Sequence, residues 1–225
     1  MRQTGEPFGA VVFDLDGVLV DAEVWWDEVR VDFARRHDRT WTEADQAAIM
    51  GANSAGWSAT MRQRLRLVEL TREEIERDVV EAMLARYRDR GAPRIDGAVD
   101  AVRRTAANLP IAVASSSPMV LIETALASLG VAASFSAVVS SDEVEVGKPA
   151  PDVYLLVASR LGVDPGACLV VEDSVNGVRA GRAAGMVVVL IPNDAVPPAP
   201  GAREAASIVL AGIEQFNVLE LALQC

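Results

Sequence analysis

The 225-residue sequence contains little cysteine and almost no histidine. One of its two cysteines, Cys168, lies inside an apolar run and is expected in the core; the other, Cys225, is the last residue. Two such residues support neither a disulfide framework nor a zinc site. The single histidine, His37, lies in the charged segment 35–39, which is typical of a solvated helix end. Metal sites and catalytic schemes that need two histidines are therefore excluded.

The sequence also lacks clustered positive charge and long apolar segments. Its formal net charge is −11, and an acidic chain repels nucleic-acid phosphates. The longest apolar stretch, residues 186–192, is much shorter than the ~20 residues that a membrane helix needs. Residues 1–7 lack the apolar segment of a signal peptide. We therefore expect a cytoplasmic monomer that binds neither nucleic acid nor membrane, and that attracts an anionic substrate by a metal or a few placed cations.

Short apolar runs predict a buried parallel sheet. Continuous apolar runs suit strands that are covered on both faces. The runs are residues 10–13, 111–114, 137–139, 168–171 and 187–191. Helix-like stretches lie between the later runs, at residues 118–129, 151–161 and 174–184. This alternation predicts an α/β fold, a doubly wound parallel sheet with a Rossmann-like core, with sites at the carboxyl ends of the strands.

A long helical segment interrupts the first strand–helix unit. We expect four helices near residues 22–36, 43–50, 54–67 and 72–90. Thr71 and Glu74 form a capping-box pattern at the start of the last helix. We interpret residues 22–94 as a small all-helical cap domain, and residues 1–21 and 95–225 as the catalytic core. The alternative is a helical hairpin packed on the sheet edge.

Two acidic pairs follow predicted strands. Asp14 and Asp16 come directly after the first strand, and alternate residues of extended chain point the same way. Glu172 and Asp173 follow the fourth strand. Because parallel strands end at the same edge of a sheet, these carboxylates can share one cation, for which Mg²⁺ is the natural candidate. The alternatives are a helix N-cap for Asp173 and a solvated strand end for Asp14.

Two further segments could bind an anion. Ser115, Ser116 and Ser117 follow the second strand and precede a helix, where backbone N–H groups favour phosphate. Lys148 lies between Gly147 and Pro149, and the fixed proline backbone restricts where it can point. The alternatives are an ordinary N-cap and an ordinary surface lysine.

In this order, the four segments resemble the haloacid dehalogenase-like hydrolase superfamily. The match extends over residues 10–191, and residues 14–21 (DLDGVLVD) carry the most specific motif. The helical insertion is similar to the cap of the subgroup that contains β-phosphoglucomutase and sugar-phosphate phosphatases. The resemblance implies a Mg²⁺-dependent phosphatase that hydrolyses a small phosphomonoester metabolite, such as a sugar or polyol phosphate.

The resemblance also implies residue roles. Asp14 would attack phosphorus and form an aspartyl-phosphate, and Asp16 would protonate the leaving oxygen and then activate water. The implied metal ligands are Asp14, Asp16 (by its carbonyl) and Asp173, with Glu172 nearby. The implied phosphate-binding residues are Ser115, Ser116 and Lys148. Possible substrate contacts in the cap are Trp25, Trp26, Asn53, Trp57 and Arg62, although at least one of the two adjacent tryptophans is expected in the cap core.

Other activities remain as alternatives. Asp16 argues against a dehalogenase, which does not need the second aspartate. A phosphonate-cleaving enzyme would need a cap lysine, and residues 22–91 contain none. A β-phosphoglucomutase-type phosphosugar mutase is the main rival. Its cap histidine and cap arginine are missing here, since Trp25 and Trp26 stand near the first and residues 50–55 contain no arginine. A non-catalytic binding protein predicts decay of the acidic motifs, which are intact.

Overall fold

The computed structural model describes residues 8–193 and 197–222. The N-terminal segment 1–7, expected to lack a signal peptide, and the terminal Cys225 lie outside the described residues. Cys168 is fully buried, as expected. Among the described residues, no helix is both long and apolar enough to cross a bilayer.

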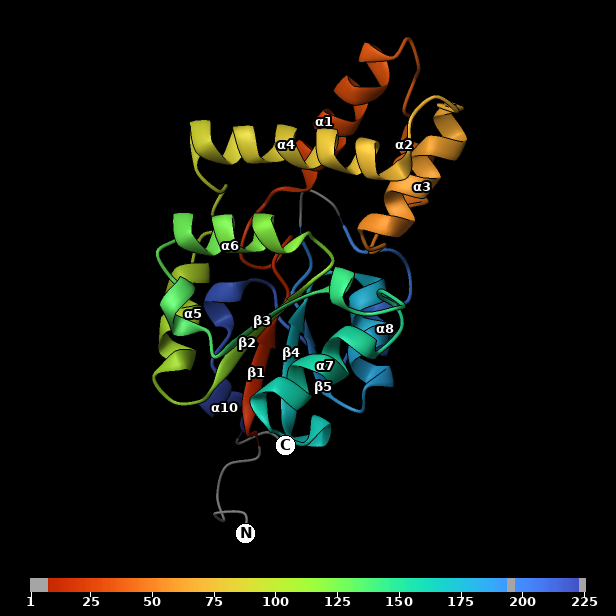
Figure 1. Cartoon of the computed structure of the whole chain (residues 1–225). Coiled ribbons are helices and arrows are strands. Elements are labelled where there is room, and N and C mark those ends of the chain that lie inside the picture. Colours follow the sequence, from red (N-terminus) through yellow and green to blue (C-terminus); the bar gives the residue numbers. More distant parts are fainter. Residues whose placement is uncertain (1–7, 194–196, 223–225) are drawn as a thin grey trace.

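The core is a six-stranded, all-parallel sheet, so the predicted α/β class is confirmed. The strand order is β3-β2-β1-β4-β5-β6, with β1 in the interior (Figure 1). The strands are β1 Ala10–Phe13, β2 Ile111–Ser115, β3 Ala137–Ser140, β4 Cys168–Glu172, β5 Val187–Leu190 and β6 Ile208–Val209. The first five lie where the apolar runs predicted them, whereas the two-residue β6 was not predicted.

Helices cover both faces of this sheet, which explains why the strands are apolar throughout. Successive residues of β1 point to opposite faces: Val11 and Phe13 pack in one hydrophobic cluster, and Ala10 and Val12 pack in the other. The first cluster includes residues of α5 (Ala98–Ala106), α6 (Met119–Ser128) and α10 (Val218–Ala222). The second includes residues of α7 (Asp152–Leu161), α8 (Val175–Ala183) and α9 (Ala202–Ala205). In Figure 1, α5 lies to the left of the strands and α8 lies to the right.

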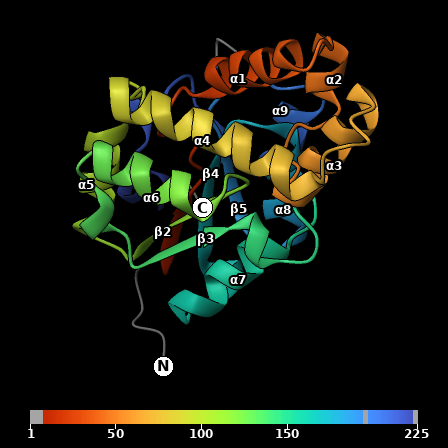
Figure 2. The same ribbon diagram turned by 45° about the horizontal axis from the view of Figure 1, so that its top comes forward.

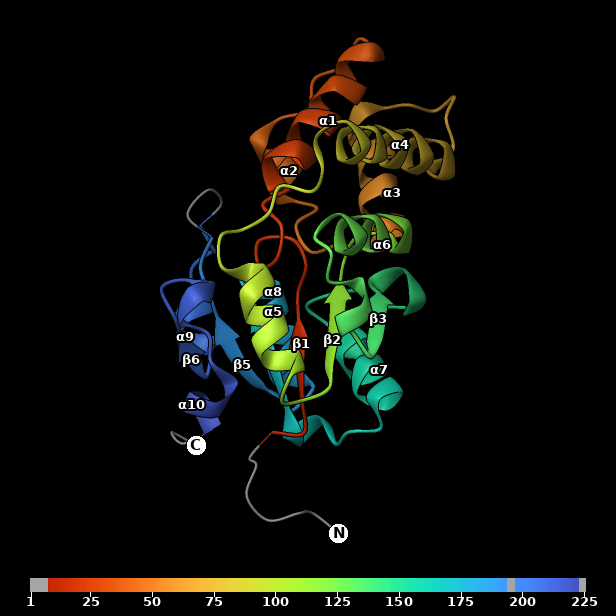
Figure 3. The same ribbon diagram turned by 90° about the vertical axis from the view of Figure 1, so that its left-hand side faces the viewer.

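Four helices between β1 and α5 lie beyond the carboxyl ends of the strands (Figures 1 and 3). They are α1 Glu23–Arg36, α2 Glu43–Ala47, α3 Ser54–Leu65 and α4 Arg72–Arg90. All four were predicted, and the capping box of Thr71 and Glu74 is present at the start of α4. The longest of them, α4, packs between α1 and the core helix α6 (Figure 2).

Polar contacts join these four helices to the core. Asp142 of the core accepts hydrogen bonds from the backbone N and the hydroxyl of Ser54, at 2.8 and 2.7 Å, at the start of α3. The side chain of Asn176 in α8 donates to the carbonyl of Met50 at 2.9 Å, and the hydroxyl of Ser116 donates to the carbonyl of Gly51 at 3.1 Å. The helical segment is therefore held against the sheet edge where the strands end.

Candidate active site

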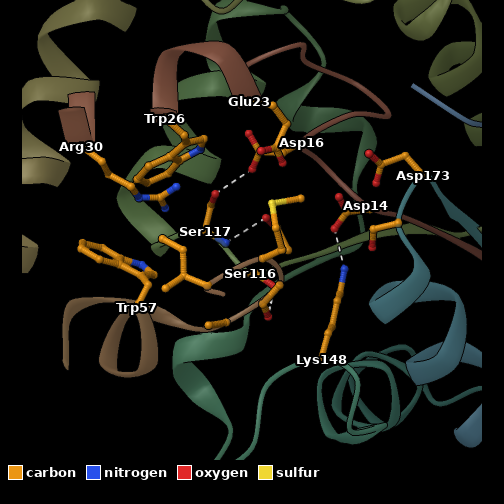
Figure 4. Close-up of a pocket in the computed structure, with 16 residues that line it drawn as sticks. Asp14, Asp16, Glu23, Trp26, Arg30, Trp57, Ser116, Ser117, Lys148 and Asp173 are labelled. Carbon is orange, nitrogen blue, oxygen red and sulfur yellow. Dashed lines mark hydrogen bonds and ion pairs between the residues drawn. The ribbon is translucent and has the colours of Figure 1, made fainter. Parts of the chain in front are cut away.

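A cavity of about 80 Å³ lies between the carboxyl ends of the strands and the helical segment (Figure 4). Parallel pairing aligns Phe13 with Val171 and with Val113, so the residues that follow β1, β2 and β4 meet at one edge. The lining residues are Asp14, Asp16, Glu23, Trp26, Arg30, Ile49, Met50, Gly51, Ala52, Trp57, Ser115, Ser116, Ser117, Lys148, Asp173 and Ser174. The segments singled out in the sequence therefore converge on one small cavity.

Lys148 lies at the centre of the acidic group. Its ammonium nitrogen is 2.6 Å from Asp14 Oδ1, 2.7 Å from Glu172 Oε1 and 3.2 Å from the carbonyl oxygen of Ala114. Only 6% of Lys148 is exposed. Burial alone would lower the pKa of this lysine, but the two carboxylates raise it well above its usual value. Lys148 is therefore a charged, buried bridge and not an ordinary surface lysine.

Asp14 and Asp173, when both are ionised, carry more negative charge than Lys148 neutralises. Burial raises the pKa of Asp14 to about 8; Lys148 opposes this shift and Glu172 adds to it. Burial, together with Glu172 and Asp14, raises the pKa of Asp173 well above its usual value. Carboxylate oxygens of Asp14, Glu172 and Asp173 lie within 4.8 Å of one another. Three buried carboxylates around one ammonium group form a donor set suited to a hard divalent cation.

Glu172 differs from the other two acids because hydrogen bonds occupy both of its oxygens. Oε1 accepts from Lys148 and from the hydroxyl of Tyr154, both at 2.7 Å. Oε2 accepts from the backbone N of Asp173 and Ser174, both at 3.1 Å, and from the Ser174 hydroxyl at 3.0 Å. Burial would raise the pKa of Glu172, but Lys148, together with the hydrogen bonds from Tyr154 and Ser174, outweighs it and keeps the pKa low. Glu172 therefore orients Lys148 and the start of α8, and Asp14 and Asp173 are better placed to ligate a cation.

The turn after β1 brings the chain against Asp173. Gly17 has φ +81°, and a Cβ atom at this position would lie 2.0 Å from Asp173 Oδ2. Its backbone N donates to the carbonyl of Val20 at 2.7 Å and closes the turn. Only glycine allows both this left-handed conformation and this close approach. The glycine in the DLDG motif thus makes room for the Asp173 carboxylate.

Asp16 faces a different part of the cavity. Its Oδ2 accepts a hydrogen bond from the Ser117 hydroxyl at 2.7 Å, and its Oδ1 is buried with no hydrogen-bond partner among the described residues. Burial raises the pKa of Asp16, while Ser117 and Trp26 act in the opposite direction. In Figure 4 its side chain points toward Glu23 and Ser117, not toward Lys148. Its carboxylate is not among the group that could hold a metal.

The serine segment after β2 is organised by its own hydroxyls. Ser115 Oγ accepts from the backbone N of Ser117 at 3.0 Å, and the carbonyl of Ser117 accepts from the Ser140 hydroxyl at 2.7 Å. Ser115 and Ser116 both line the cavity, as the sequence predicted. Ser117 belongs to the segment predicted to bind an anion, but its hydrogen bond to Asp16 was not predicted. It belongs to the same run of serines, but its role depends on where Asp16 points.

The predicted substrate contacts divide into two groups. Trp26 and Trp57 line the cavity, and Trp26 is also buried in the hydrophobic core, as expected for one of the adjacent tryptophans. Trp25, Asn53 and Arg62 do not line it.

The three that lie elsewhere have other partners. Trp25 packs against Tyr87, with 6.0 Å between ring centroids. Asn53 caps α3 by accepting a hydrogen bond from the backbone N of Gly56 at 3.0 Å. The guanidinium group of Arg62 donates to the carbonyl oxygens of Val68 and Leu70. Each of these three side chains is held within the helical segment, and their contact with a substrate stays a prediction.

Glu23 and Arg30 also line the cavity, and neither was predicted as a site residue. Both lie on α1 with Trp26, at a spacing of three, four and seven residues. Residues at this spacing share one face of a helix. This helix face follows directly after the acidic motif and carries one acid, one indole and one cation. That pattern could have identified Glu23 and Arg30 as site residues.

Comparisons with known proteins agree with this architecture. The family model for "haloacid dehalogenase-like hydrolase" matches residues 8–185. Hexitol phosphatase B of Escherichia coli K12 is 32% identical over 224 residues, which cover 94% of this chain and 93% of the relative. Fructose-1-phosphate phosphatase of the same strain is 33% identical over 190 residues, which cover 80% of this chain and 95% of the relative. The crystal structure of β-phosphoglucomutase from Clostridium difficile has a TM-score of 0.81 at 18% identity, covering 95% of each chain, and shows a shared fold.

Proposed function

The chain belongs to the haloacid dehalogenase-like hydrolase family, and we propose that it is a Mg²⁺-dependent phosphatase of small sugar or polyol phosphates. The observation that carries this proposal is the arrangement of Asp14 and Asp16 in one cavity. A buried lysine holds Asp14 next to a possible cation site. Asp16 lies apart from Asp14 and accepts a hydrogen bond from the Ser117 hydroxyl. Phosphoryl transfer needs positioning and charge neutralisation, and this arrangement supplies both.

Asp14 is the proposed nucleophile. Lys148 fixes Oδ1, while Oδ2 accepts no hydrogen bond from any described residue. Oδ2 would form a bond to phosphorus as the ester P–O bond breaks, which gives an aspartyl-phosphate and an alkoxide leaving group. A carboxylate nucleophile splits one difficult displacement into two easier ones. Water would then attack the phosphorus of this intermediate, releasing inorganic phosphate and the free Asp14 carboxylate.

Asp16 is the proposed general acid and base. Burial raises its pKa, which favours the protonated form needed to give a proton to the leaving oxygen. After that transfer the carboxylate can accept a proton from the attacking water, so the proton balance closes over one turnover. The Ser117 hydroxyl fixes the orientation of Asp16 through Oδ2. Its unpartnered Oδ1 is then the oxygen available to the substrate.

Asp14 and Asp173, with the backbone carbonyl of Asp16, are the proposed Mg²⁺ ligands. The surplus of buried negative charge over Lys148 supports this assignment. When bound, Mg²⁺ neutralises the charge of the phosphoryl oxygens and of Asp14. Lys148, Ser115 and the backbone at Ser116 would hold the remaining phosphoryl oxygens. In this proposal Glu172 keeps Lys148 in place and does not itself ligate the metal.

The substrate class is proposed from the relatives and the cavity together. The similar proteins named above are phosphatases of hexitol and fructose phosphates. The cavity of about 80 Å³ is small beside the ~300–1,000 Å³ typical of larger ligands. We propose that residues 22–94 act as a cap, which opens to admit a small phosphomonoester and closes to exclude bulk water.

A phosphosugar mutase is the second candidate, because the C. difficile structure shares the fold. A mutase must return the phosphoryl group to a sugar and not to water. The lone histidine, His37, is the C-cap residue of α1 and does not line the cavity. The cavity walls near Asp16 are Trp26 and Arg30 instead, which supports hydrolysis over return transfer.

The deciding experiment measures phosphate release from hexitol, ketose and polyol phosphates and phosphoglycolate, with Mg²⁺ and with EDTA. Mg²⁺-dependent release from the hexitol or ketose phosphates is expected. Acid quenching during turnover, followed by borohydride reduction, should convert Asp14 to homoserine in peptide mass spectra. Conversion of β-glucose 1-phosphate in the presence of its bisphosphate, without phosphate release, would instead establish a mutase. The absence of all turnover and of the trapped residue would leave a non-catalytic binding protein.

A further inference from the structure

The guanidinium group of Arg30 is buried in the cavity wall between two indoles. It lies 4.7 Å from the ring centroid of Trp26 and 5.5 Å from that of Trp57. Only 8% of Arg30 is exposed. The two aromatic faces hold the guanidinium plane in place and supply cation–π attraction. Arg30 is therefore a fixed cation, not a mobile surface side chain (Figure 4).

The hydrogen-bonding capacity of Arg30 is largely unused within the described part of the chain. Its Nη1 donates to Gln46 Oε1 at 3.2 Å, and Gln46 Oε1 also accepts from Trp41 Nε1 at 3.2 Å. The Nε of Arg30 is buried and donates to no described residue. A buried charged donor without an acceptor is costly, so such groups normally meet a ligand or a water molecule. The unpaired Nε in the cavity wall is therefore open to an acceptor on a bound ligand.

Glu23 supplies the complementary acceptor. It lies seven residues before Arg30 on the same face of α1, and both side chains line the cavity. No described residue donates a hydrogen bond to the Glu23 carboxylate. In Figure 4 Glu23 lies beside Asp16, the proposed general acid, so it borders the place where the leaving group would sit. One unused acceptor and one unused donor therefore flank this end of the cavity.

The charges around this end disfavour a second anion. The Glu23 carboxylate and, once it has given up its proton, the Asp16 carboxylate face the single positive charge of Arg30. An additional phosphate or carboxylate on the leaving group would meet two acids for one cation. Neutral hydroxyl groups, which donate to Glu23 and accept from Arg30, suit both partners without surplus charge.

We propose that Arg30 and Glu23 are specificity residues that select an uncharged, hydroxyl-bearing leaving group. Arg30 Nε donates to one hydroxyl of that group, and Glu23 accepts from another. This inference rests on the proposed phosphatase activity and narrows its substrates to monophosphates of neutral polyols and sugars. Hydroxyl-free alkyl phosphates and bisphosphates are then poor substrates.

The test compares three substrates of equal carbon number: a hexitol 6-phosphate, n-hexyl phosphate and a hexitol 1,6-bisphosphate. Wild type should have the highest kcat/KM on the hexitol 6-phosphate. Arg30→Met should lower that value about 10- to 100-fold and change the value for n-hexyl phosphate less than about 3-fold. Arg30→Lys keeps the charge and the apolar stem and guards against misfolding; it should show a loss in the same direction. Glu23→Gln should raise the kcat/KM ratio of bisphosphate to monophosphate. Arg36→Met, at the exposed end of α1, is the matched control.

Each outcome decides the inference. A wild-type preference for the bisphosphate or for n-hexyl phosphate would overturn it. An equal loss on the hydroxylated and hydroxyl-free substrates, in Arg30 variants with wild-type circular dichroism, would show a structural role and also overturn it. If wild type releases phosphate from none of the three, nor from p-nitrophenyl phosphate, the proposed phosphatase function itself fails, and the inference falls with it.

Discussion

The ammonium group of Lys148 lies 2.6 Å from a carboxylate oxygen of Asp14, a residue 134 positions away in the chain. The contact forms because β1 ends beside β4, whose last residue, Glu172, holds the same lysine at 2.7 Å. Removing one partner of a buried ion pair leaves an uncompensated charge, which typically costs about 3–5 kcal/mol. Lys148 therefore stabilises this edge of the sheet and also takes part in the proposed chemistry there.

The burial of Lys148 can be measured directly because it is the only lysine in the sequence. Amine reagents need an exposed, neutral amine, and Lys148 is both buried and held charged by its two acids. We expect acetylation of Lys148 in the native protein to be slower than in urea by about 100-fold or more, since it requires local opening. Peptide mass spectrometry after timed labelling measures this ratio. Equal rates in both conditions would mean that the lysine is not buried.

Asp14→Asn should abolish turnover without unfolding the protein. The amide cannot attack phosphorus, and we expect kcat to fall by about 10³-fold or more. The substitution keeps the shape of the side chain, relieves repulsion with Glu172 and leaves Lys148 paired with Glu172, so the unfolding midpoint should stay within a few degrees of wild type. Asp100→Asn, at an exposed position of α5, is the control for the loss of one carboxylate. Retention of full activity by Asp14→Asn would exclude the proposed mechanism.

Mg²⁺ should stabilise the folded protein through Asp14 and Asp173. A ligand at 100 times its Kd adds about 2.7 kcal/mol, which for a chain of this size corresponds to a rise in Tm of roughly 5–10 °C. Differential scanning fluorimetry with and without EDTA measures the rise. Asp173→Asn should remove most of it, whereas Asp164→Asn, far from the cavity, should keep it. The same rise in both variants would place the cation elsewhere.

Much of the α/β core could be predicted because each of its first five strands is marked by a short local sequence pattern. A strand covered on both faces must be apolar at every position, so Ala10–Phe13 was visible as a run. The strand β6, Ile208–Val209, has two residues at the sheet edge, too few to form a pattern. The helix α5 does carry a spacing signal, with Ala98, Ala101, Val102 and Thr105 buried, but it was not recognised.

The candidate site was predictable where one strand end carries several site residues. Asp14 and Asp16 lie two positions apart in one motif, whereas the role of Glu172 depends on Tyr154 from another element. A sequence pattern does not reveal that five donors occupy the Glu172 carboxylate. Contacts within the helical segment are still harder to predict from the sequence, because they depend on how its helices pack. Arg62 was predicted only as a possible substrate contact, and the sequence pattern did not show that carbonyl groups near the end of α3 hold its guanidinium group.

Gly17→Ala should disrupt the Asp173 carboxylate specifically. The added Cβ would lie 2.0 Å from Asp173 Oδ2, so the acid must move, and the Mg²⁺-induced rise in Tm should be lost together with activity. Gly130→Ala is the matched control, since Gly130 also has positive φ, +67°, but a Cβ there meets nothing within 4 Å. Both variants should lose roughly 1 kcal/mol to backbone strain. If Gly17→Ala binds Mg²⁺ as Gly130→Ala does, the close approach has no bearing on the cation site.

Glu23→Gln should stabilise the protein at high pH more than at low pH. Burial raises the pKa of Glu23 from 4.5 to about 7. The negative charges of Asp16 and Asp21 add to this rise, and the positive charge of Arg30 opposes it. Between these values the folded protein binds more protons at Glu23 than the unfolded chain does, so the free energy of unfolding falls as pH rises through this window. Below about pH 4.5 both states are protonated and the penalty is absent, whereas above about pH 7 it is complete.

Glutamine carries no such penalty at any pH. We therefore expect the free energy of unfolding of Glu23→Gln, relative to wild type, to be larger at pH 8 than at pH 5 by about 1–3 kcal/mol. Urea denaturation in EDTA at both pH values measures the difference without a contribution from bound metal. Glu81→Gln, at an exposed position of α4, controls for the removal of one negative charge. A difference that stays constant between pH 5 and pH 8 would mean that Glu23 is not held in the buried, acidic surroundings from which its role at the leaving group is argued.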